Sequence, residues 1–447
     1  MMAEVPLKRL VVVIGSTGTG KSDLAIRIAQ VDNKYSQNIT TITHLYNPES
    51  CRVHCAQSCN GEVINADAVQ LYKGLDIPCN KVTGPEQATV KHHLLDMLDP
   101  TETWTVHDYH KAATPIIDDI CSRGKLPVLC GGTNYYIQSL LWPSLMTDRG
   151  DEEPGAAEGR EEDGGAGSQV GEAEAAYRRL REVDPEMAIR LHPANLRKVL
   201  RSLEVFDQTG RKHSELIAEQ QTANLKAAPL YDACIFWIHC EQQVLDNRLD
   251  GRVAKMIERG MLGEIQEFRS LLVGFGHPFN FTKGILQAIG FKEFAPYLDL
   301  SEQEREEPAG QVLLKECIVE VERSTRKYAK RQLTWIRNRT LRMRPAVPIY
   351  QLDGSDIARW DETVVNPALK VVESLQEQRP LPQEFRVELE EPLDDASKHQ
   401  QHHCELCTKT VRGSSEWQAH LKSRAHRRAG EKQRKKRRGA GAAEQPE

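Results

Sequence analysis

Short, nearly unbroken runs of apolar residues mark the strands that this chain is expected to bury. Such runs cover residues 8–14, 62–66, 126–130 and 233–239, and residues 21–30 between the first two have a helical pattern. A run without polar alternation is typical of a strand that is covered on both faces. Because helical stretches separate these strands, the pattern predicts a parallel α/β sheet.

The remaining patterns predict how the chain is divided. Residues from Ala175 to about Ala218 are purely helical and predict an inserted helical domain, and the stretch from Glu241 to Arg339 is again mostly helical. A stretch rich in Pro, Glu and Asp precedes a small module and reads as a linker. We expect a core with an insertion (1–145, insertion 31–59), an acidic loop with the helical domain (146–225), the second core part (226–375), a linker (376–399), a finger (400–430) and a basic tail (431–447).

The net charge of the chain is -5, but acidic and basic residues are concentrated in separate segments. Residues 148–174 are rich in Gly, Ala and Glu, carry about eight net negative charges and are predicted to form a disordered loop. Residues 322–344 and 422–438 are strongly basic, which is compatible with RNA binding.

No apolar run is long enough to span a membrane, and no signal or transit peptide is recognisable before the first strand. We therefore expect reduced cysteines and a cytoplasmic or nuclear location.

A glycine-rich turn follows the first predicted strand and opens the first predicted helix. Residues Gly15 to Ser22 fit the phosphate-binding pattern G-x-x-x-x-G-K-[ST] in the context that such a loop requires. Backbone N–H groups and the helix N-terminus face the anion, Lys21 adds a positive charge, and the Ser22 hydroxyl can ligate Mg²⁺. This P-loop predicts a bound diphosphate or triphosphate and a P-loop NTPase-like core, but it leaves the choice of phosphate ligand open.

The C-terminal module has the spacing of a zinc finger. Cys404, Cys407, His420 and His426 fit C-x₂-C-x₁₂-H-x₅-H, the ligand set of a closed, structural Zn²⁺ site in a ββα module. Apolar residues for its small core and basic residues for phosphate contacts are also present: Val411, Trp417, Lys422, Arg424, Arg427 and Arg428. The basic run from Lys432 to Arg438 is either a nuclear localisation signal or a further phosphate-binding surface.

One helical segment near the end of the core combines cations with aromatic residues. Between Thr325 and Arg339 it carries Arg326, Lys327, Lys330, Arg331, Arg337 and Arg339, with Tyr328 and Trp335 interleaved. Cations can neutralise RNA phosphates, and aromatic rings can stack on bases. The alternative is an amphipathic helix with a solvated basic face and Trp335 in the core. The basic residues Arg197, Lys198 and Arg201 of the helical insertion allow the same two interpretations.

Several stretches in a fixed order resemble the tRNA dimethylallyltransferase family, in particular its eukaryotic form with a C-terminal zinc finger. They cover most of the chain and include Gly15–Ser22, Asn65–Ile77, Gly131–Tyr136, Asp184–Pro185, Leu191–Pro193, Arg197–Val199, Leu203–Phe206, Arg248–Gly260, Ala288–Phe294 and Tyr328–Trp335. The resemblance implies transfer of a dimethylallyl group from dimethylallyl diphosphate to N6 of adenosine 37 of tRNA, beside the anticodon. It also implies an enzyme that uses catalytic Mg²⁺ and structural Zn²⁺ and whose partners are the tRNA anticodon stem-loop and the prenyl donor. One chain holds a whole site, so we expect a monomer.

The same resemblance implies roles for individual residues. Asp67 would be the general base, and Thr19 and Arg252 would complete the catalytic set, with Arg252 as a second ligand of the diphosphate. The donor's diphosphate would lie against Thr17, Gly18, Thr19, Gly20, Lys21 and Ser22. Contacts to tRNA are expected from Asp67, Ala68, Val69, Gln70, Thr133, Arg197, Lys198, Arg201, Lys283, Arg326, Lys330, Arg331 and Trp335. Without the resemblance, Asp67 would read as a turn or cap residue, and Arg252 as a solvated arginine.

Two departures from the family pattern are visible. Residues 31–59 form an insertion with Cys51, Cys55 and Cys59, which we interpret as a surface loop, with a metal site as the alternative. Ala68 stands where relatives usually have Ser. Two other functions remain open at this level: a P-loop kinase with a fused finger, and an RNA-binding protein without catalysis. Binding of dimethylallyl diphosphate would exclude the first, and loss of modification but not of tRNA binding on changing Asp67 would exclude the second.

Overall fold

A computed structural model describes most of the chain in two compact units. The described residues are 7–30, 61–142, 169–193, 195–226, 230–274, 276, 281, 284–343, 347–388, 401–407 and 409–430. The first unit comprises Met1–Gly159 with Ala223–Leu389, and the second comprises Arg160–Thr222 with Glu390–Glu447. The insertion 31–59 with its cysteines, the basic tail 431–447 and Lys283 lie outside the described residues.

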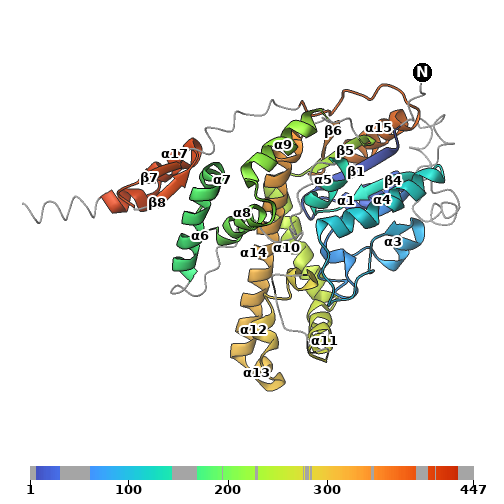
Figure 1. Ribbon diagram of the computed structural model, residues 1–447. Coiled ribbons are helices and arrows are strands. Elements are labelled where there is room, and N and C mark those ends of the chain that lie inside the picture. Colours follow the sequence, from blue (N-terminus) through green and yellow to red (C-terminus); the bar gives the residue numbers. More distant parts are fainter. Residues whose placement is uncertain are drawn as a thin grey trace, which may run out of the picture. The chain divides into compact units, whose positions relative to one another are not determined.

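The first unit is built on a parallel sheet (Figure 1). Six strands of the described chain form it in the order β3-β2-β4-β1-β5-β6, and every neighbouring pair is parallel. The strands are β1 Arg9–Gly15, β2 Gly61–Asn65, β3 His92–His93, β4 Leu126–Cys130, β5 Asp232–His239 and β6 Ile349–Asp353. The predicted α/β class and the four predicted strands are confirmed, whereas β3 and β6 were missed.

Both faces of the sheet are buried, which explains the unbroken apolar runs. Along β1, Leu10, Val12 and Ile14 pack into one core cluster, and the alternate residues Val11 and Val13 pack into another. The first cluster includes buried residues of α4 (Val106–Ser122) and α5 (Asn134–Leu141). The second includes buried residues of α1 (Lys21–Gln30, as predicted) and α15 (Asn366–Gln376). Helices therefore cover the two faces, as parallel sheets require.

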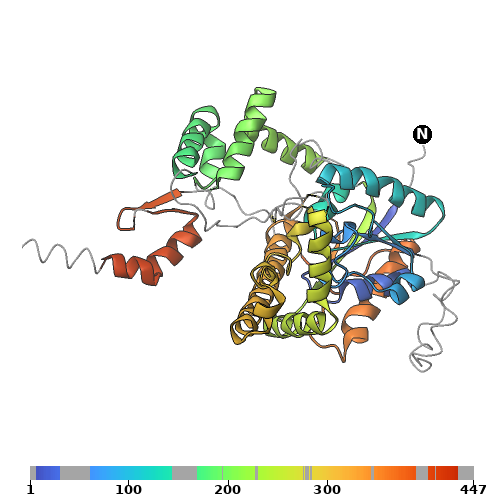
Figure 2. The same cartoon turned by 90° about the horizontal axis from the view of Figure 1, so that it is seen from below.

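A group of helices after β5 reaches the sheet at its carboxyl edge. The long helix α14 (Pro308–Asn338) contacts α10 (Gln242–Glu258), α5 and β1, and α10 in turn contacts α11 (Met261–Gly274). Figures 1 and 2 show this group of helices beside the sheet. The basic helix predicted over 325–339 is thus the C-terminal half of a longer one. The remaining short helices of this unit are α3 Gly84–Thr89, η3 Val69–Leu71, η5 Gly284–Gln287, α12 Ala295–Leu298, α13 Glu302–Glu306, η6 Thr340–Arg342 and η7 Asp361–Val365.

The predicted helical insertion consists of α6 Gln169–Val183, α7 Pro185–Arg190, α8 Leu196–Thr209 and α9 His213–Lys226. Its core cluster contains Leu180, Met187 and Val199. The buried Asp184 caps α7 by accepting the Met187 N–H (3.0 Å), and it accepts the Ser214 N–H (2.9 Å) and hydroxyl (2.7 Å) at the start of α9. Helix α6 begins at Gln169, so the loop predicted over 148–174 is wrong for its last residues.

Two segments near the C-terminus have defined structure. Part of the stretch interpreted as a linker lies along β6, since Val387 N–H donates to Ile349 O (2.8 Å) and Gln351 N–H donates to Phe385 O (2.9 Å). The finger module forms an antiparallel pair, β7 Gln401–Cys404 and β8 Lys409–Arg412, followed by α17 Ser414–Lys422. The predicted ββα order is therefore present.

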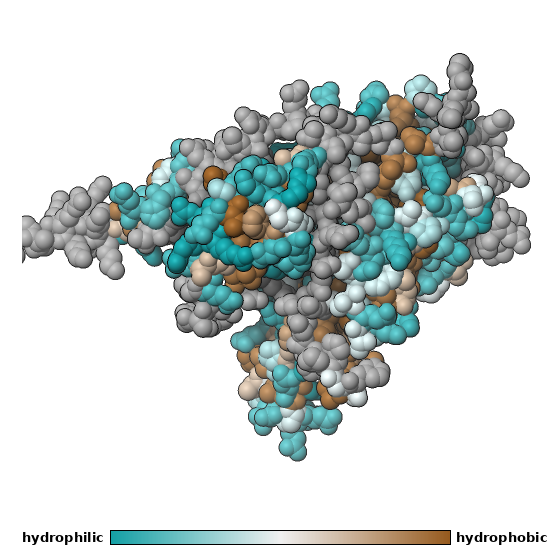
Figure 3. Space-filling model, viewed as in Figure 1, coloured by the Kyte–Doolittle hydropathy of each residue, from teal (hydrophilic) through white to brown (hydrophobic). Residues whose placement is uncertain are grey.

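The outer surface is mixed in character. Large exposed hydrophobic side chains such as Val312 and Val319 are scattered among hydrophilic residues, and Figure 3 shows this mixture on one face. Across the described ranges, we find no helix with the length and apolar character needed to cross a bilayer. Within these ranges the cysteines are not joined in disulfides, and Cys404 and Cys407 belong to the predicted metal site.

Candidate active site

The glycine-rich turn between β1 and α1 has the backbone shape of a phosphate cradle. Gly18 (φ 82°) and Gly20 (φ 90°) adopt left-handed conformations that L side chains rarely reach. The first amides of α1 have no acceptor within the helix, because each would need a carbonyl four residues earlier in the helix. These amides and the positive end of the helix dipole create a site for an anion.

Internal hydrogen bonds hold this loop in shape. The Thr19 hydroxyl donates to Ser16 O (2.8 Å), and the side chain is only 1% exposed. The Lys21 ammonium donates to the same carbonyl (2.8 Å). Thr19 therefore supports the loop from within, and Lys21 rests on the loop backbone. The Ser22 side chain, in the first turn of α1, is exposed.

Asp67 lies just beyond the carboxyl end of β2. Its backbone N–H donates to Asn65 Oδ1 (3.0 Å), and Asn65 Nδ2 donates to Leu94 O (2.8 Å), so the segment is fixed from within the core. One carboxylate oxygen of Asp67 accepts the Val69 N–H (3.2 Å). Asp67 therefore does stabilise a turn, as expected of an isolated aspartate. It also lies at the carboxyl edge of the sheet, where ligands of α/β proteins bind.

A second loop from β4 touches the Asp67 segment. Thr133 N–H donates to Ala66 O (3.0 Å), and Ala68 N–H donates to the Thr133 hydroxyl oxygen (2.9 Å). A Cβ on Gly131 would lie 2.1 Å from Ala66 O, which is a backbone atom and cannot move away cheaply. The two loops are therefore packed backbone against backbone, and Thr133 positions the Asp67 segment.

Replacing Gly131 by alanine is expected to destabilise the folded chain by about 3 kcal/mol or more, because the added methyl overlaps the backbone at Ala66. Denaturant unfolding of the purified variant measures this. Gly263→Ala in α11 is the matched control: nothing lies within 4 Å of its added methyl, so helix propensity should leave stability unchanged or raised. Equal stabilities of the two variants would contradict the packing described.

Arg252 on α10 lies near this carboxylate. Burial lowers the pKa of its guanidinium, and the charge of Asp67 opposes that shift. Within the described part of the chain, the Arg252 guanidinium makes no hydrogen bond or ion pair. Arg252 is half-buried, and a partly desolvated cation without such a partner is unfavourable, so a bound anion would relieve that cost.

The charged groups at this edge affect one another. Burial lowers the pKa of Lys21 to about 8, with Asp67 opposing and Arg252 reinforcing the shift. Burial also raises the pKa of Asp67, against the opposing charges of Lys21 and Arg252. The buried Cys130 has its pKa raised to about 12 and stays a thiol at neutral pH. Two cations and one carboxylate thus meet at one site, which suits an anionic leaving group beside a proton acceptor.

Sequence reasoning missed a residue that joins the two loops. The Gln332 side-chain oxygen accepts the Thr17 N–H (2.8 Å), and its amide nitrogen donates to Gly132 O (3.0 Å). Gln332 is 5% exposed and belongs to α14. The available signal was a glutamine on the helix face that carries the buried residues Ala329, Leu333 and Ile336. The Thr17 amide is therefore already bonded within the protein.

The basic residues of α14 are placed differently from one another. Lys330 and Arg331 are exposed, whereas Arg326 forms an ion pair with Asp250 on α10. Trp335 is half-buried, with Tyr135 at its edge (ring centroids 6.2 Å apart) and the Arg339 guanidinium over its face (4.5 Å). The basic residues of this helix are therefore divided between solvent and protein contacts, and RNA binding by the exposed ones stays a prediction.

The other residues predicted to contact tRNA lie in two places. Ala68 is buried, and Val69 and Gln70 are half-buried beside Asp67, with Gln70 Nε2 donating to Cys79 O (3.1 Å). The residues of the helical insertion lie on α8, where Arg197 is exposed and Arg201 pairs with Glu204 (2.8 Å). Lys198 is half-buried on the same helix.

An indole from the C-terminal part of the core covers the phosphate loop. The Trp360 Nε1–H donates to Asp23 Oδ2 (2.8 Å) at the start of α1. A Cβ on Gly20 would lie 2.4 Å from the Trp360 ring, so this glycine is required by contact as well as by its φ. The sequence offered no signal that residues 340 positions apart would meet.

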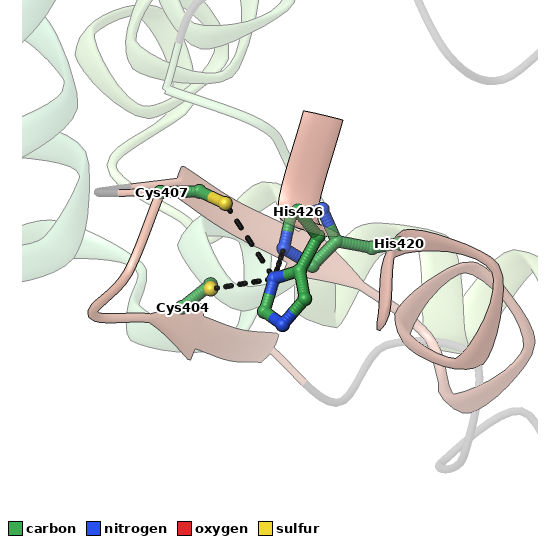
Figure 4. A group of neighbouring side chains, drawn as sticks. All are labelled: Cys404, Cys407, His420 and His426. Atoms are coloured by element: carbon green, nitrogen blue, oxygen red, sulfur yellow. Dashed lines mark hydrogen bonds between the residues drawn. The ribbon is translucent and has the colours of Figure 1, made fainter. Parts of the chain in front are cut away.

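The four predicted metal ligands of the finger come together (Figure 4). The ligand atoms of Cys404, Cys407, His420 and His426 all lie within 4.8 Å of one another. His426 Nδ1 is 3.4 and 3.5 Å from the two sulfur atoms and 3.2 Å from His420 Nε2. One ring nitrogen cannot hydrogen bond to three such atoms at once, whereas a tetrahedral metal with these ligands requires edges of about 3.4–3.8 Å. This group could hold a metal ion.

The spacing of the two histidines has a local structural reason. Helix α17 ends at Lys422, and the chain becomes helical again over residues 424–430 after a break at Ser423. The Ser423 hydroxyl accepts the His426 N–H (3.1 Å) and so fixes the start of the second segment. Trp417 stacks between His402 and His420, at centroid distances of 5.1 and 5.6 Å.

Comparison with known proteins gives a consistent result. A family model described as "IPP transferase" matches residues 70–339. The chain is 38% identical to the tRNA dimethylallyltransferases of Mus musculus and Homo sapiens, over 93% of this chain and 85% of each relative. Among solved structures it is similar to a eukaryotic dimethylallyltransferase acting on tRNA, with 28% identity, a TM-score of 0.72 and coverage of 97% of this chain and 99% of that one.

Proposed function

Because the chain belongs to the IPP transferase family, we propose that it transfers a dimethylallyl group from dimethylallyl diphosphate to N6 of adenosine 37 of tRNA. The products are N6-isopentenyladenosine and diphosphate. The observation that carries this proposal is the meeting of a phosphate loop, Lys21, Arg252 and Asp67 at one edge of the sheet. This arrangement suits loss of diphosphate from carbon and loss of a proton from an amine in the same step.

The phosphate loop holds the donor in this proposal. The free amides of Gly18, Gly20 and the first turn of α1 bind the diphosphate, together with the Lys21 ammonium. Arg252 approaches from α10 as a second cation. When diphosphate departs from the allylic carbon, negative charge grows on its oxygens, and these fixed cations stabilise it. The Ser22 hydroxyl, which is exposed, would ligate Mg²⁺, and the ion would neutralise the same developing charge.

Asp67 acts on the acceptor. The exocyclic amine of adenine is a weak nucleophile, and a carboxylate within hydrogen-bond reach can accept its proton as the carbon–nitrogen bond forms. The raised pKa of Asp67 makes this carboxylate a stronger base than one in water. The electron-poor allylic carbon must be protected from hydrolysis by water. Water is excluded when the adenine leaves its stack in the RNA and fills the site.

Exposed basic residues bind the tRNA in this proposal. Lys330 and Arg331 on α14 and Arg197 on α8 are accessible to phosphates, and Trp335 and Tyr135 offer aromatic surface. We propose that these residues hold the anticodon stem-loop while Thr133 and Ala68 shape the adenine side of the site. Their effect should be salt-dependent, because phosphate contacts release counterions.

The experiment that tests the function uses the purified chain, an anticodon stem-loop RNA and labelled dimethylallyl diphosphate with Mg²⁺. Label should appear on N6 of adenosine 37. The matched control is the same RNA with guanosine at that position, which has a carbonyl oxygen at C6 in place of the N6 amine and should remain unlabelled. Phosphate transfer from ATP without transfer of the isoprenoid would overturn the proposal in favour of a kinase.

We also propose that the finger holds a structural Zn²⁺ ion, which supplies no catalysis because its four protein ligands leave no open position. Cys407→Ser is expected to lower bound zinc from one equivalent to near zero and to unfold the finger locally. Atomic absorption and amide NMR of the finger region measure the two effects. Cys121→Ser, outside the cluster, should retain the full metal content. Unchanged zinc in Cys407→Ser would contradict the site.

A further inference from the structure

Gln332 is held between two loops with a fixed orientation. Its oxygen accepts the Thr17 N–H (2.8 Å), and its nitrogen donates to Gly132 O (3.0 Å). The amide cannot be reversed, because its NH₂ group would then face an N–H and its oxygen would face a carbonyl oxygen. A Cβ on Gly132 would lie only 2.3 Å from the Gln332 nitrogen, so the Gln332 side chain packs closely against the backbone at Gly132.

The two loops carry the two halves of the proposed reaction. Thr17 belongs to the phosphate loop, which would hold the donor. Gly132 directly precedes Thr133, whose backbone and hydroxyl hold Ala66 and Ala68 on either side of Asp67. A change in the distance between Thr17 and Gly132 would therefore change the distance between the donor and the base.

We propose that Gln332 is a positioning residue that keeps the donor loop and the base-bearing loop at the spacing that transfer requires; this rests on the proposed function. A misplacement of about 1 Å between reacting groups can cost about 10²-fold in rate. Gln332 lies beside Lys330 and Arg331 on α14. The helix with candidate RNA contacts is thus also the one that sets this spacing.

The alternative is that Gln332 only fills space in the core, and Gln332→Met separates the two. Methionine has nearly the same length and volume but makes neither hydrogen bond. Gln138→Met on α5 is the matched control, because Gln138 is also buried (2% exposed) and uses its side chain, donating to the Thr340 hydroxyl (3.3 Å). A purely structural role predicts similar consequences for both variants.

Gln332→Met is expected to lower kcat for prenyl transfer by about 10- to 100-fold. The dissociation constants for dimethylallyl diphosphate and for the stem-loop RNA, each measured alone, should change by less than about 3-fold. Gln138→Met should keep kcat within about 2-fold of the parent chain. Single-turnover transfer and separate binding titrations provide these values. Gln332→Asn, which is one methylene too short to reach both loops, should repeat the kcat loss if the methionine variant folds poorly.

Two outcomes would overturn the positioning role. One is equal kcat in Gln332→Met and Gln138→Met, and the other is a loss of donor affinity as large as the loss of kcat, which indicates a binding role instead. The proposed function fails separately. If the parent chain and Gln138→Met both transfer no prenyl group, the function itself is wrong, and the inference falls with it.

Discussion

Replacing Asp67 by asparagine lowers the rate of prenyl transfer by about 10²- to 10⁴-fold in our expectation, the range that a positioned general base contributes. Asparagine keeps the shape of the side chain and can still accept the Val69 N–H through its oxygen. It cannot accept the proton of the adenine amine at neutral pH. The loss should therefore appear in kcat, while binding of the stem-loop RNA is largely retained, as single-turnover assays and RNA titrations can measure.

The same variant has a predictable stability. Burial raises the pKa of Asp67, so the folded chain disfavours the ionised form, and stability falls as pH rises through the window between the unfolded and folded pKa values. Asparagine removes this cost, and Asp67→Asn should be at least as stable as the parent chain at pH 7. Asp99→Asn, at an exposed ion pair with Lys73, is the matched control and should retain activity. Full activity in Asp67→Asn would exclude the base role.

Replacing Lys21 by methionine is expected to lower kcat by about 10²- to 10³-fold, as removal of one preorganised charge-stabilising group does elsewhere. Methionine keeps the apolar length of the side chain but offers no charge to the leaving diphosphate. Affinity for the donor should fall as well, because the ammonium also attracts the diphosphate before reaction. Lys73→Met, at an exposed position, is the control that should leave both quantities unchanged.

A pH titration tests the same group in the unmodified chain. The pKa of Lys21 is lowered to about 8, so its positive charge is present below that pH and lost as pH rises through it. Affinity of the free enzyme for dimethylallyl diphosphate should therefore decline above about pH 8, where the ordinary lysine pKa would predict no change. In Lys21→Met this decline should be absent. A decline that persists in the variant would assign it to another group.

The parts of the fold that could be predicted share one physical origin. A strand with both faces buried produces an apolar run that needs no other information, and β1, β2, β4 and β5 were found in this way. Strand β3 spans two residues, His92 and His93, and carries no such run. In β6 the burial alternates towards its end, with Gln351 and Asp353 exposed, because this strand lies at the edge of the sheet. Short strands and edge strands are therefore the ones that the hydrophobic pattern of the sequence does not predict.

The candidate site divides in a similar way. The phosphate loop is a local motif, so its residues, its glycine conformations and the helix behind it could be predicted together. Contacts between distant segments could not. Gln332 meets Thr17 across 315 positions and Gly132 across 200, and nothing in the local sequence of either partner requires a glutamine opposite. The support that Thr133 gives to the Asp67 segment is also a product of tertiary packing.

The indole of Trp360 against Gly20 makes the phosphate loop observable with light. Emission from an indole responds to the polarity of its surroundings, and this ring touches the loop backbone and donates its N–H to Asp23. Binding of a diphosphate to this loop should alter its fluorescence without any attached dye. Of the six tryptophans in the chain, the contribution of this one can be isolated by subtracting the spectrum of a Trp360→Phe chain. Donor binding can then be followed in real time, before any RNA is added.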